Sequence, residues 1–526
     1  MKKLWEVILI GAMVLSVFAG CGSGSSENVN FQKETANKLG DLGGLELPLA
    51  DKPTTIEWSV TTDHENFNSS WVAEKLREVT GLDVQFRVVP GATAKDKLSV
   101  WIASKNLPDI IGQGIEKTIS DDLAVQGGIA AVEDYVNVLP NFKKTFVENE
   151  KNNWIFKSYA APDGKLYGFY GYDWNRDVNH GVLYRKDIFE KHNIPMWNGP
   201  DEFYIALKKL KQQYPSSTPF TSKNKDELFG KLATSWGTKA FEPYYDETDN
   251  TWKYSDTDPK FKNMLDYMKK LYDEKLLDPE FMTLTQAAWT SKMTQADKAF
   301  VTWDWIGRLD TFVQQAAAVP GYDLRYGNPI GPNQTITEAD QLCWARYVAK
   351  NENAETSFKL LDFVLSPAGA ELLTMGIPGE TYELDDKGMA KYIEYTYSDA
   401  ENTPNMSKLL QKYGMYTQGL YLKFDRRSVY FNFTEREQEA QNYAKDSAHL
   451  DPIDPSVVFT AEEQEKVNEY RAKLNKAGRE FVSKYILSNE TGDVAWNAWV
   501  EKANGMGAQE LINIYNEAQK RYDNQK

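Results

Sequence analysis

The chain has 526 residues, a formal net charge of −16 at pH 7, 41% hydrophobic residues and two cysteines. So acidic a chain argues against nucleic acid as a partner, while its length and apolar content allow more than one large core. Two cysteines exclude a framework of disulfides or a cysteine-rich zinc cluster.

The first 50 residues have the layout of an exported, lipid-anchored protein. Two lysines precede an apolar run from Val7 to Ala19 that is too short to span a bilayer, as in a signal peptide over residues 1–20. The segment Phe18-Ala19-Gly20-Cys21 at the end of this run resembles the lipobox of bacterial lipoproteins, so we expect lipid on Cys21. The alternative is a buried hydrophobic hairpin with an incidental thiol. Residues 21–50 are small and polar, which predicts a flexible tether. The rest of the chain has no second apolar run long enough for a membrane helix.

Strand and helix patterns alternate from about residue 52. Ile56, Trp58 and Val60 alternate with polar residues and predict a strand. A helix with one apolar face should follow, capped by Ser69 or Ser70 and ended by Gly81. The later predicted elements are a strand at 83–90, a helix and short strand within 95–112, a helix within 199–215, a hairpin at 244–260 and a long helix at 460–487 with a Thr-Glu capping box. This order indicates α/β layers with largely parallel sheets.

Several catalytic patterns are missing from the chain. It has no glycine-rich phosphate loop, no His-Glu-x-x-His, no Gly-x-Ser-x-Gly and no Cys-x-x-Cys. The four histidines are scattered. Asp246, Thr248 and Asn250 have the alternation of calcium ligands, but no glycine occupies the sixth position, so a hairpin turn is the better interpretation. We therefore expect no metal and no cofactor.

Aromatic residues are abundant, with 15 Trp, 29 Tyr and 24 Phe. A sugar ring packs its apolar face on an aromatic plane, and its hydroxyl groups need directional partners such as Asp, Asn and Arg. Three stretches combine both kinds of group, and their candidate ligand contacts are Tyr172, Asp173, Trp174 and Arg176; Trp303, Asp304, Trp305 and Arg308; and Asp63 and His64. Any one of these aromatics could instead belong to a core, and Asp304 could cap a helix that starts at Ile306.

From about residue 52 to the end the chain resembles a known family. The resemblance is carried by "ASKNLPDIIG" at 103–112, "DGKLYGFY" at 163–170, "LYRKDIFEKHNIP" at 183–195 and "KAFVTWDWIG" at 298–307. These motifs are similar to those of the extracellular solute-binding proteins of carbohydrate ABC importers, in the long lipoprotein branch of the maltose-binding-protein-like family. The resemblance implies an α/β, two-lobe periplasmic-binding-protein-like (type II) fold with a hinge and an interlobe cleft.

The same resemblance implies a division of the chain and a metal-free site. Lobe 1 should comprise 51–175 and 336–400, and lobe 2 should comprise 176–335 and 401–526. The chain should cross between them near 171–181, 334–342 and 395–415. Tyr382 falls where the first lobe returns and joins the candidate ligand contacts. Related alginate-binding proteins carry a calcium loop in the stretch matching 221–230, but its acidic alternation is absent here.

The implied function is that of a non-enzymatic receptor held by lipid on the extracellular face of the cell membrane. It would capture an oligosaccharide and deliver it to the permease subunits of an importer driven by a cytoplasmic ATPase, acting as a monomer. Two alternatives stay open. A surface glycoside hydrolase would use carboxylates such as Asp173, Asp177 and Asp304, and a peptide or lipopeptide receptor would share the fold and differ only in its ligand.

Overall fold

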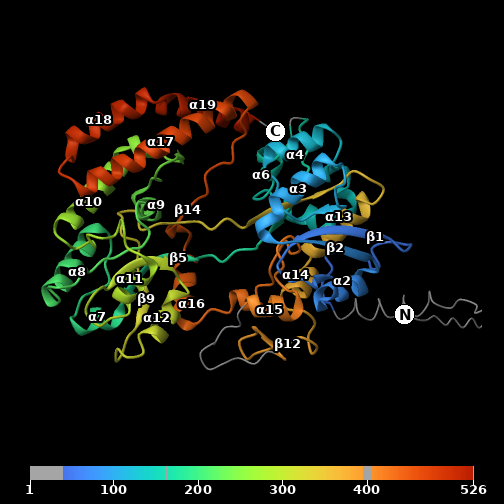
Figure 1. The fold of residues 1–526 in the computed structure, drawn as a ribbon, viewed down its shortest axis with the longest axis horizontal. Coiled ribbons are helices and arrows are strands. Elements are labelled where there is room, and N and C mark those ends of the chain that lie inside the picture. Colours follow the sequence, from blue (N-terminus) through green and yellow to red (C-terminus); the bar gives the residue numbers. More distant parts are fainter. Residues whose placement is uncertain (1–38, 162, 395–405, 525–526) are drawn as a thin grey trace, which may run out of the picture.

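The computed structural model describes residues 39–161, 163–394 and 406–524, which form two lobes side by side (Figure 1). Cys21, the signal peptide and the first part of the tether lie outside the described residues. Within the described part, no helix combines the length and the apolar character needed to cross a membrane.

The first lobe is built on a five-stranded mixed sheet. Its order is β2 (Asp83–Val89), β1 (Thr55–Thr61), β3 (Ile110–Ile111), β11 (Leu342–Val348) and β4 (Phe169–Tyr172). Strand β1 runs parallel to β2 and β3, whereas β11 is antiparallel to β3 and β4. Helix α2 (Trp71–Thr80) follows β1, with Ser70 as its N-cap and a left-handed Gly81 at its end. The predicted strand and helix at 55–81 are confirmed.

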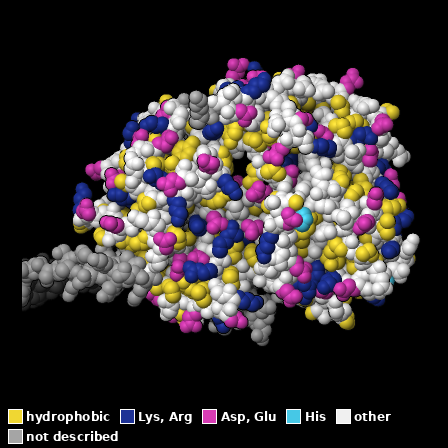
Figure 2. All heavy atoms as spheres, turned by 180° about the vertical axis from the view of Figure 1, so that it is seen from behind, with side chains coloured by type: hydrophobic (Ala, Val, Ile, Leu, Met, Phe, Trp, Pro, Cys, Tyr) yellow, Lys and Arg dark blue, Asp and Glu magenta, His cyan; other side chains and the backbone are white. Residues whose placement is uncertain are grey.

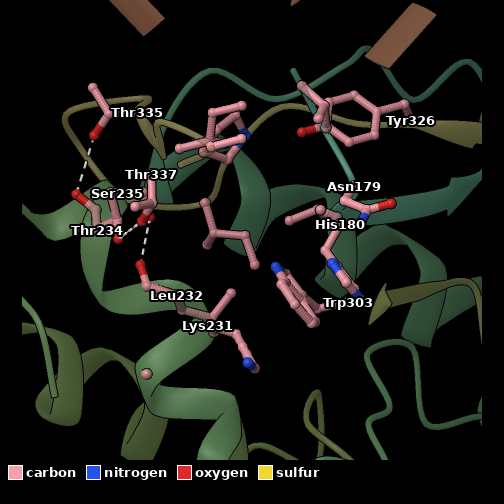
Figure 3. A pocket seen from close by; sticks show the side chains of 18 of the residues that line it. Asn179, His180, Lys231, Leu232, Thr234, Ser235, Trp303, Tyr326, Thr335 and Thr337 are labelled. Atoms are coloured by element: carbon pink, nitrogen blue, oxygen red, sulfur yellow. Dashed lines mark hydrogen bonds between the residues drawn. The ribbon is translucent and has the colours of Figure 1, made fainter. Parts of the chain in front are cut away.

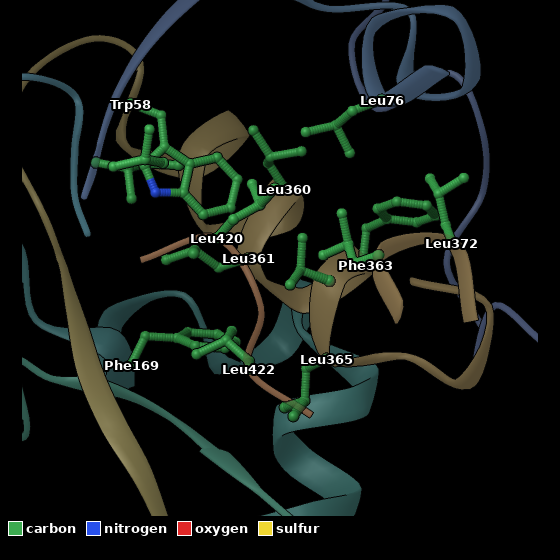
Figure 4. Close-up of a cluster of buried hydrophobic side chains, with 14 of the residues drawn as sticks. Trp58, Leu76, Phe169, Leu360, Leu361, Phe363, Leu365, Leu372, Leu420 and Leu422 are labelled. Carbon is green, nitrogen blue, oxygen red and sulfur yellow. The ribbon is translucent and has the colours of Figure 1, made fainter. Parts of the chain in front are cut away.

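Helices on both faces of this sheet complete the first core. Trp58, Phe169 and a group of leucines gather there (Figure 4), because β1 buries alternate side chains and α13 and α14 bury nearly their whole surface. The helices of this lobe are α3 (Ala94–Ala103), α4 (Lys117–Val125), α5 (Pro140–Phe142), α6 (Trp154–Ser158), α13 (Ala354–Leu365), α14 (Pro367–Thr374) and α15 (Met406–Tyr413). A small hairpin, β12 (Tyr382–Leu384) with β13 (Ala390–Tyr392), lies at its edge.

Residues 39–50 differ from the expected flexible tether. Leu39 and Leu49 are buried in the first core, and the backbone N–H of Leu49 donates to Thr80 O at 3.0 Å. The N–H of Ala368 likewise donates to Asp41 O at 2.9 Å. Scattered leucines in a polar stretch therefore suffice to fasten it to the lobe, and packing begins before residue 51.

The second lobe has a smaller sheet under a larger share of helix. Strand β5 (His180–Arg185) lies between β8 (Val301–Trp305) and β9 (Leu324–Tyr326), antiparallel to both. The prediction of largely parallel sheets is therefore wrong. Strands β4, β5 and β11 adjoin the segments that cross between the lobes, so they enter their sheets without the helical crossover that parallel neighbours need.

The other elements of the second lobe surround that sheet. Its hairpin is β6 (Pro243–Asp246) with β7 (Thr251–Tyr254), as predicted. The helices are α7 (Lys186–Lys191), α8 (Pro200–Gln213), α9 (Glu227–Ala233), α10 (Pro259–Asp273), α11 (Gln286–Met293), α12 (Arg308–Gln315) and α16 (Glu435–Tyr443). The predicted helix at 199–215 corresponds to α8, which buries Phe203, Leu207 and Leu210.

Three segments connect the lobes. The first joins β4 to β5, and the second joins β10 (Ile336–Thr337) to β11. The third connection had been expected near 395–415, but residues from Leu409 to Phe431 pack into the first core and α16 packs on the second lobe. The chain therefore crosses just before α16. Because apolar residues such as Leu420 and Leu422 are buried in the first core, the third crossing lies later in the chain than expected.

The C-terminal helices reach from the second lobe toward the first. Helix α17 (Ala461–Leu487) begins with the predicted capping box of Thr460 and Glu463. With α18 (Gly492–Gly505) and α19 (Ala508–Asn524) it lies along one side of the second lobe, and the C-terminal end lies beside α4 and α6 (Figure 1). There the Lys157 ammonium lies 5.8 Å from the ring centre of Tyr522. The lobes thus meet at the hinge and again at this distal contact.

Candidate functional site

A cavity of about 330 Å³ lies where two of the connecting segments enter the second lobe. Its lining comes from the first crossing and β5, from the end of α9, from β8, from the turn after β9 and from the second crossing (Figure 3). Five separate stretches of the chain therefore converge here. Figure 2 shows the hollow between the two halves of the molecule from behind. Clefts at the junction of α/β lobes are common ligand sites.

Trp303 is the principal aromatic group of this cavity. It lies on β8 opposite Val182 of β5, and the imidazole of His180 stacks on it with a centroid distance of 5.2 Å and an interplanar angle of 4°. The Lys231 ammonium lies 5.3 Å from the centre of the indole. Figure 3 shows Trp303 between these two side chains at the cavity wall. Burial lowers the pKa of His180, which favours the neutral imidazole at pH 7.

Hydroxyl groups line the opposite wall. Thr234 Oγ1 and Thr337 Oγ1 are 2.8 Å apart and share a hydrogen bond, and the hydroxyl of Thr335 donates to Thr234 O at 3.1 Å. Ser235 Oγ accepts from Gly331 N at 3.0 Å. A side chain on Gly331 would collide with Ser235 O at 2.2 Å, so this close backbone approach requires glycine. The wall offers small polar groups at fixed positions opposite an aromatic plane.

A second cavity, of about 230 Å³, lies on the first-lobe side. Trp174, from the first crossing, lies 5.6 Å from Trp344 of β11, measured between ring centroids. Trp344 is 52% exposed, and Tyr159, Tyr170 and Tyr347 complete an aromatic lining. Within the described residues, the buried Nε1 of Trp174 has no hydrogen-bond partner. This wall is therefore predominantly aromatic.

Asp304 has a structural role in β8. Its carboxylate is only 4% exposed and lies 2.5 Å from the Lys223 ammonium and 3.2 Å from Arg308 Nε. It points to the other side of the strand from Trp303 and Trp305, since neighbouring side chains on a strand alternate. The N-cap of α12 is Gly307, so the helix-cap interpretation of Asp304 is wrong. Trp305, by contrast, is 40% exposed.

Tyr172, Asp173 and Arg176 lie at the hinge. Tyr172 packs edge-on against Phe146 of the first core. Asp173 accepts from Arg426 Nε at 2.8 Å, and its N–H donates to Gln341 O at 3.0 Å, which joins the first crossing to the second. Arg176 Nε donates to Tyr430 O at 2.8 Å, and burial lowers the pKa of its guanidinium. These side chains fasten the connecting segments to one another.

Of the predicted ligand contacts, Trp303 lines the first cavity and Trp174 the second, and the others line neither. Asp63 is exposed, and His64 Nε2 lies 3.1 Å from Gln411 O within the first lobe. Tyr382 is 1% exposed, and its hydroxyl donates to Glu371 Oε1 at 2.5 Å. Because β12 turns this ring into the first core, Tyr382 presents no free face to a ligand.

His180, Lys231 and Trp344 are among the residues of the two walls that were not predicted as ligand contacts. His180 pairs in register with Trp305 across β5 and β8, so its proximity to Trp303 depends on sheet pairing. Trp344 lies in "QLCWARYV", which has the composition of an ordinary buried strand. Lys231 is one of many lysines, and only the end of α9 brings it to the indole.

The described residues contain no group of three or more His, Cys, Asp or Glu side chains placed to hold a metal ion. In the stretch 221–230, where the family resemblance raised the question of a calcium loop, Asp226 pairs with Arg479 at 2.6 Å. The chemistry of the two walls is that of reversible binding through ring faces and hydrogen bonds.

Several known proteins are similar to this chain in sequence or in fold. YtcQ of Bacillus subtilis, a polygalacturonan/rhamnogalacturonan-binding protein, is 25% identical over 296 residues, which is 53% of this chain and 53% of YtcQ. The match thus spans about half the length of that relative. Lipoprotein LipO of B. subtilis is 24% identical over 412 residues, 73% of this chain and 74% of LipO. The ABC-transporter substrate-binding protein FusA of S. pneumoniae, solved with kestose, has a TM-score of 0.62 at 19% identity, covering 89% of this chain and 99% of FusA.

The fold and the family agree. The likeness to FusA supports the two-lobe solute-binding fold, and residues 71–381 match the bacterial extracellular solute-binding protein family, whose members bind solutes and are not enzymes. Since this match covers more than half of the 526 residues, the chain belongs to the family of bacterial extracellular solute-binding proteins.

Proposed function

We propose that this protein captures an oligosaccharide between its two lobes and delivers it to the permease subunits of an ABC importer, which a cytoplasmic ATPase drives. The observation that carries the proposal is the pair of aromatic walls, with Trp303 on the second lobe and Trp174 with Trp344 on the first. Indole faces pack on the apolar faces of sugars, and the threonine and serine hydroxyls of the second wall suit sugar hydroxyls.

The name of YtcQ supports a carbohydrate ligand, since that relative is described as binding polygalacturonan and rhamnogalacturonan. A hydrolytic role finds no support. Of the three carboxylates considered for catalysis, Asp173 and Asp304 are each engaged by two cationic side chains, and Asp177 lies 3.6 Å from Arg426 Nη1. A glycoside hydrolase needs two carboxyl groups that face the scissile bond from either side, whereas these side chains are occupied by ion pairs.

The proposal includes a lipid anchor at Cys21 on the extracellular face of the membrane. It rests on the lipobox-like Phe-Ala-Gly-Cys stretch and on the similarity to lipoprotein LipO. The exchange Cys21→Ala should release folded protein from the membrane fraction, because stable anchoring needs acyl chains on this residue. Equal membrane retention of the variant and the native protein would contradict the anchor at Cys21, and it would not bear on the proposed binding function.

A thermal-shift screen of the mature protein against oligosaccharides tests the binding function. A ligand that binds only the folded state raises the melting temperature, by an amount that grows with the logarithm of the ligand concentration relative to Kd. Oligomers of galacturonic acid, rhamnogalacturonan fragments and neutral fructans are the first probes, and hydrophobic peptides provide the comparison for a peptide receptor. Mass spectrometry of the bound probe should show an unaltered chain length. A shift with peptides alone would contradict the proposal.

A further inference from the structure

We propose that the second-lobe cavity selects acidic oligosaccharides, with Lys231 as the counter-ion for a sugar carboxylate that lies beside Trp303. This inference rests on the proposed function and deepens it by naming the class of ligand. It concerns the cavity of about 330 Å³ and the charged groups that surround it.

The first observation is the state of Lys231 itself. Its ammonium lies 5.3 Å from the ring centre of Trp303, its side chain is exposed, and it makes no ion pair with the described residues. Most cations near the cleft are already paired, as Lys223 and Arg308 are with Asp304. An unpaired cation over an indole, at the wall of a cavity, leaves an anion-binding position open to a ligand.

The second observation is the local balance of charge. Behind Trp303, the single carboxylate of Asp304 faces both the Lys223 ammonium and the Arg308 guanidinium. Lys231 adds a further positive charge in front. The one acidic residue in the lining, Asp177, lies 3.6 Å from Arg426 Nη1. The surroundings of Trp303 therefore carry an excess of positive charge.

This local excess opposes the charge of the whole chain, which is −16. Figure 2 shows Lys and Arg side chains gathered below the hollow between the lobes, among widely scattered acidic groups. A protein with a strongly negative field repels an acidic sugar unless its binding site reverses the sign locally. The first-lobe cavity does not do so, because the charged side chain in its lining is Asp340. The carboxylate of a bound sugar should accordingly face the second lobe.

His180 supplies the neutral part of the same recognition. It stacks on Trp303 with nearly parallel rings, and burial lowers its pKa. As a neutral ring it stiffens the indole and retains a polar nitrogen at the edge of the cavity. A uronate ring on Trp303 would thus meet an aromatic face, the ammonium of Lys231 and the hydroxyl groups of the threonine wall.

The experiment compares two ligands that share a ring and differ in charge. Isothermal titration of the mature protein uses trigalacturonic acid and its fully methyl-esterified form. We expect the acid to bind about tenfold to a hundredfold more tightly than the ester, the range for a hydrogen bond to a charged group. The exchange Lys231→Met should abolish this difference by weakening the acid alone. Added salt should weaken binding of the acid and leave the ester unchanged.

The matched control is Lys209→Met, which removes the same charge from an exposed position on α8. It should preserve the preference for the acid. The affinities and the melting temperature of a second variant, Lys231→Gln, are also measured. They show whether a folding defect in the methionine variant accounts for its loss of affinity. Equal affinity of the wild type for acid and ester, or tight binding of neutral fructans alone, would overturn the acidic preference and leave the proposed function standing. If no oligosaccharide binds at all, the proposed function falls and the inference with it.

Discussion

The two walls of the cleft share aromatic groups and differ in what accompanies them. On the first lobe, Trp174 and Trp344 lie among tyrosines with one carboxylate, Asp340, whose pKa is raised by burial. On the second lobe, Trp303 lies among threonines, a neutral histidine and an unpaired lysine. Stacking surface is thus present on both sides, whereas the positive charge is confined to one. If a ligand lies between the two walls as proposed, it gains the full set of contacts only when both walls reach it, so we expect binding to favour closure of the lobes.

The largest effect should follow from breaking the support of the second wall. The exchange Asp304→Ala leaves the Lys223 ammonium and the Arg308 guanidinium without their buried counter-ion. Removing one partner of a buried pair costs about 3 to 5 kcal/mol, and the partial exposure of both cations favours the lower end. Urea denaturation measures the loss. The control is Asp173→Ala at the hinge, where the pairs are more exposed and the loss should be about 1 kcal/mol or less. Equal losses would contradict the distinction.

The next effect depends on pH and compares one buried carboxyl in each lobe. Burial raises the pKa of Asp256 in the second lobe and of Asp362 in the first, each from 3.8 to about 6. The folded state therefore holds these protons more tightly than the unfolded state, and each contribution to stability is lost as pH rises from about 4 through 6. A shift of this size corresponds to about 3 kcal/mol per group.

Substitution by asparagine distinguishes the two carboxyls. Asp256→Asn should remove the contribution of this group to the dependence of unfolding free energy on pH. The variant should still fold, because Phe241 N–H and the Ser255 hydroxyl both donate to Oδ1, which the asparagine keeps. Asp362→Asn should also cost stability at every pH, because Phe142 N donates to Oδ1 while Asn141 donates to Oδ2 and an amide cannot accept at both positions. Thermal unfolding at pH 4 and pH 7 measures the difference. An unchanged slope in Asp256→Asn would exclude this group.

The tryptophans of the two walls should separate affinity from stability. Trp344→Ala removes a largely exposed ring, so we expect affinity to fall about tenfold to a hundredfold with little change in melting temperature. Trp303 packs against the second core and on His180, so Trp303→Ala should weaken binding similarly and also lower stability, by less than the about 3 to 5 kcal/mol lost with a fully buried aromatic ring. Isothermal titration measures the affinity of both variants, and thermal unfolding measures their stability. Normal affinity in folded Trp344→Ala would remove the first wall from the site.

The smallest effect concerns the hinge between the walls. Arg426 contacts Asp173 and Asp177, at the two ends of the first crossing. Its replacement by Ala should change stability by less than about 1 kcal/mol, as for exposed ion pairs. It should nevertheless widen the range of interlobe distances, which pulsed dipolar spectroscopy between spin labels on the two lobes measures. Identical distance distributions would show that this arginine does not restrain the hinge.

Local patterns predicted much of the fold. The alternation of Ile56, Trp58 and Val60 predicted β1, and a serine before and a glycine after the helical pattern predicted the bounds of α2. Neither pattern depends on distant residues. Parallel sheets were predicted wrongly because strand direction depends on which lobe the preceding segment comes from. The third crossing was misplaced for a similar reason, since apolar residues such as Leu420 could have packed on either lobe.

The site was predictable only in part. Trp174 and Trp303 stand in stretches that mix ring faces with polar groups, and each lines a cavity. Tyr382 stands in similar company, but the pairing of β12 with β13 buries it. Lys231 and His180 reach Trp303 from α9 and β5, far away along the chain. A composition that suits a sugar can be recognised along the sequence, whereas the side of a strand that faces the cleft is decided by tertiary packing.

The distal contact, where Tyr522 of α19 meets Lys157 of the first lobe, is a suitable place for a dye that reports movement of the lobes. Any change in the angle between the lobes must alter the surroundings of the last turn of α19, far from the ligand itself. A solvatochromic dye on an exposed neighbour such as Asp523 would therefore change colour on closure without obstructing either cavity. The free thiol of Cys343 is buried, so it would compete little with a cysteine introduced at position 523 for the dye.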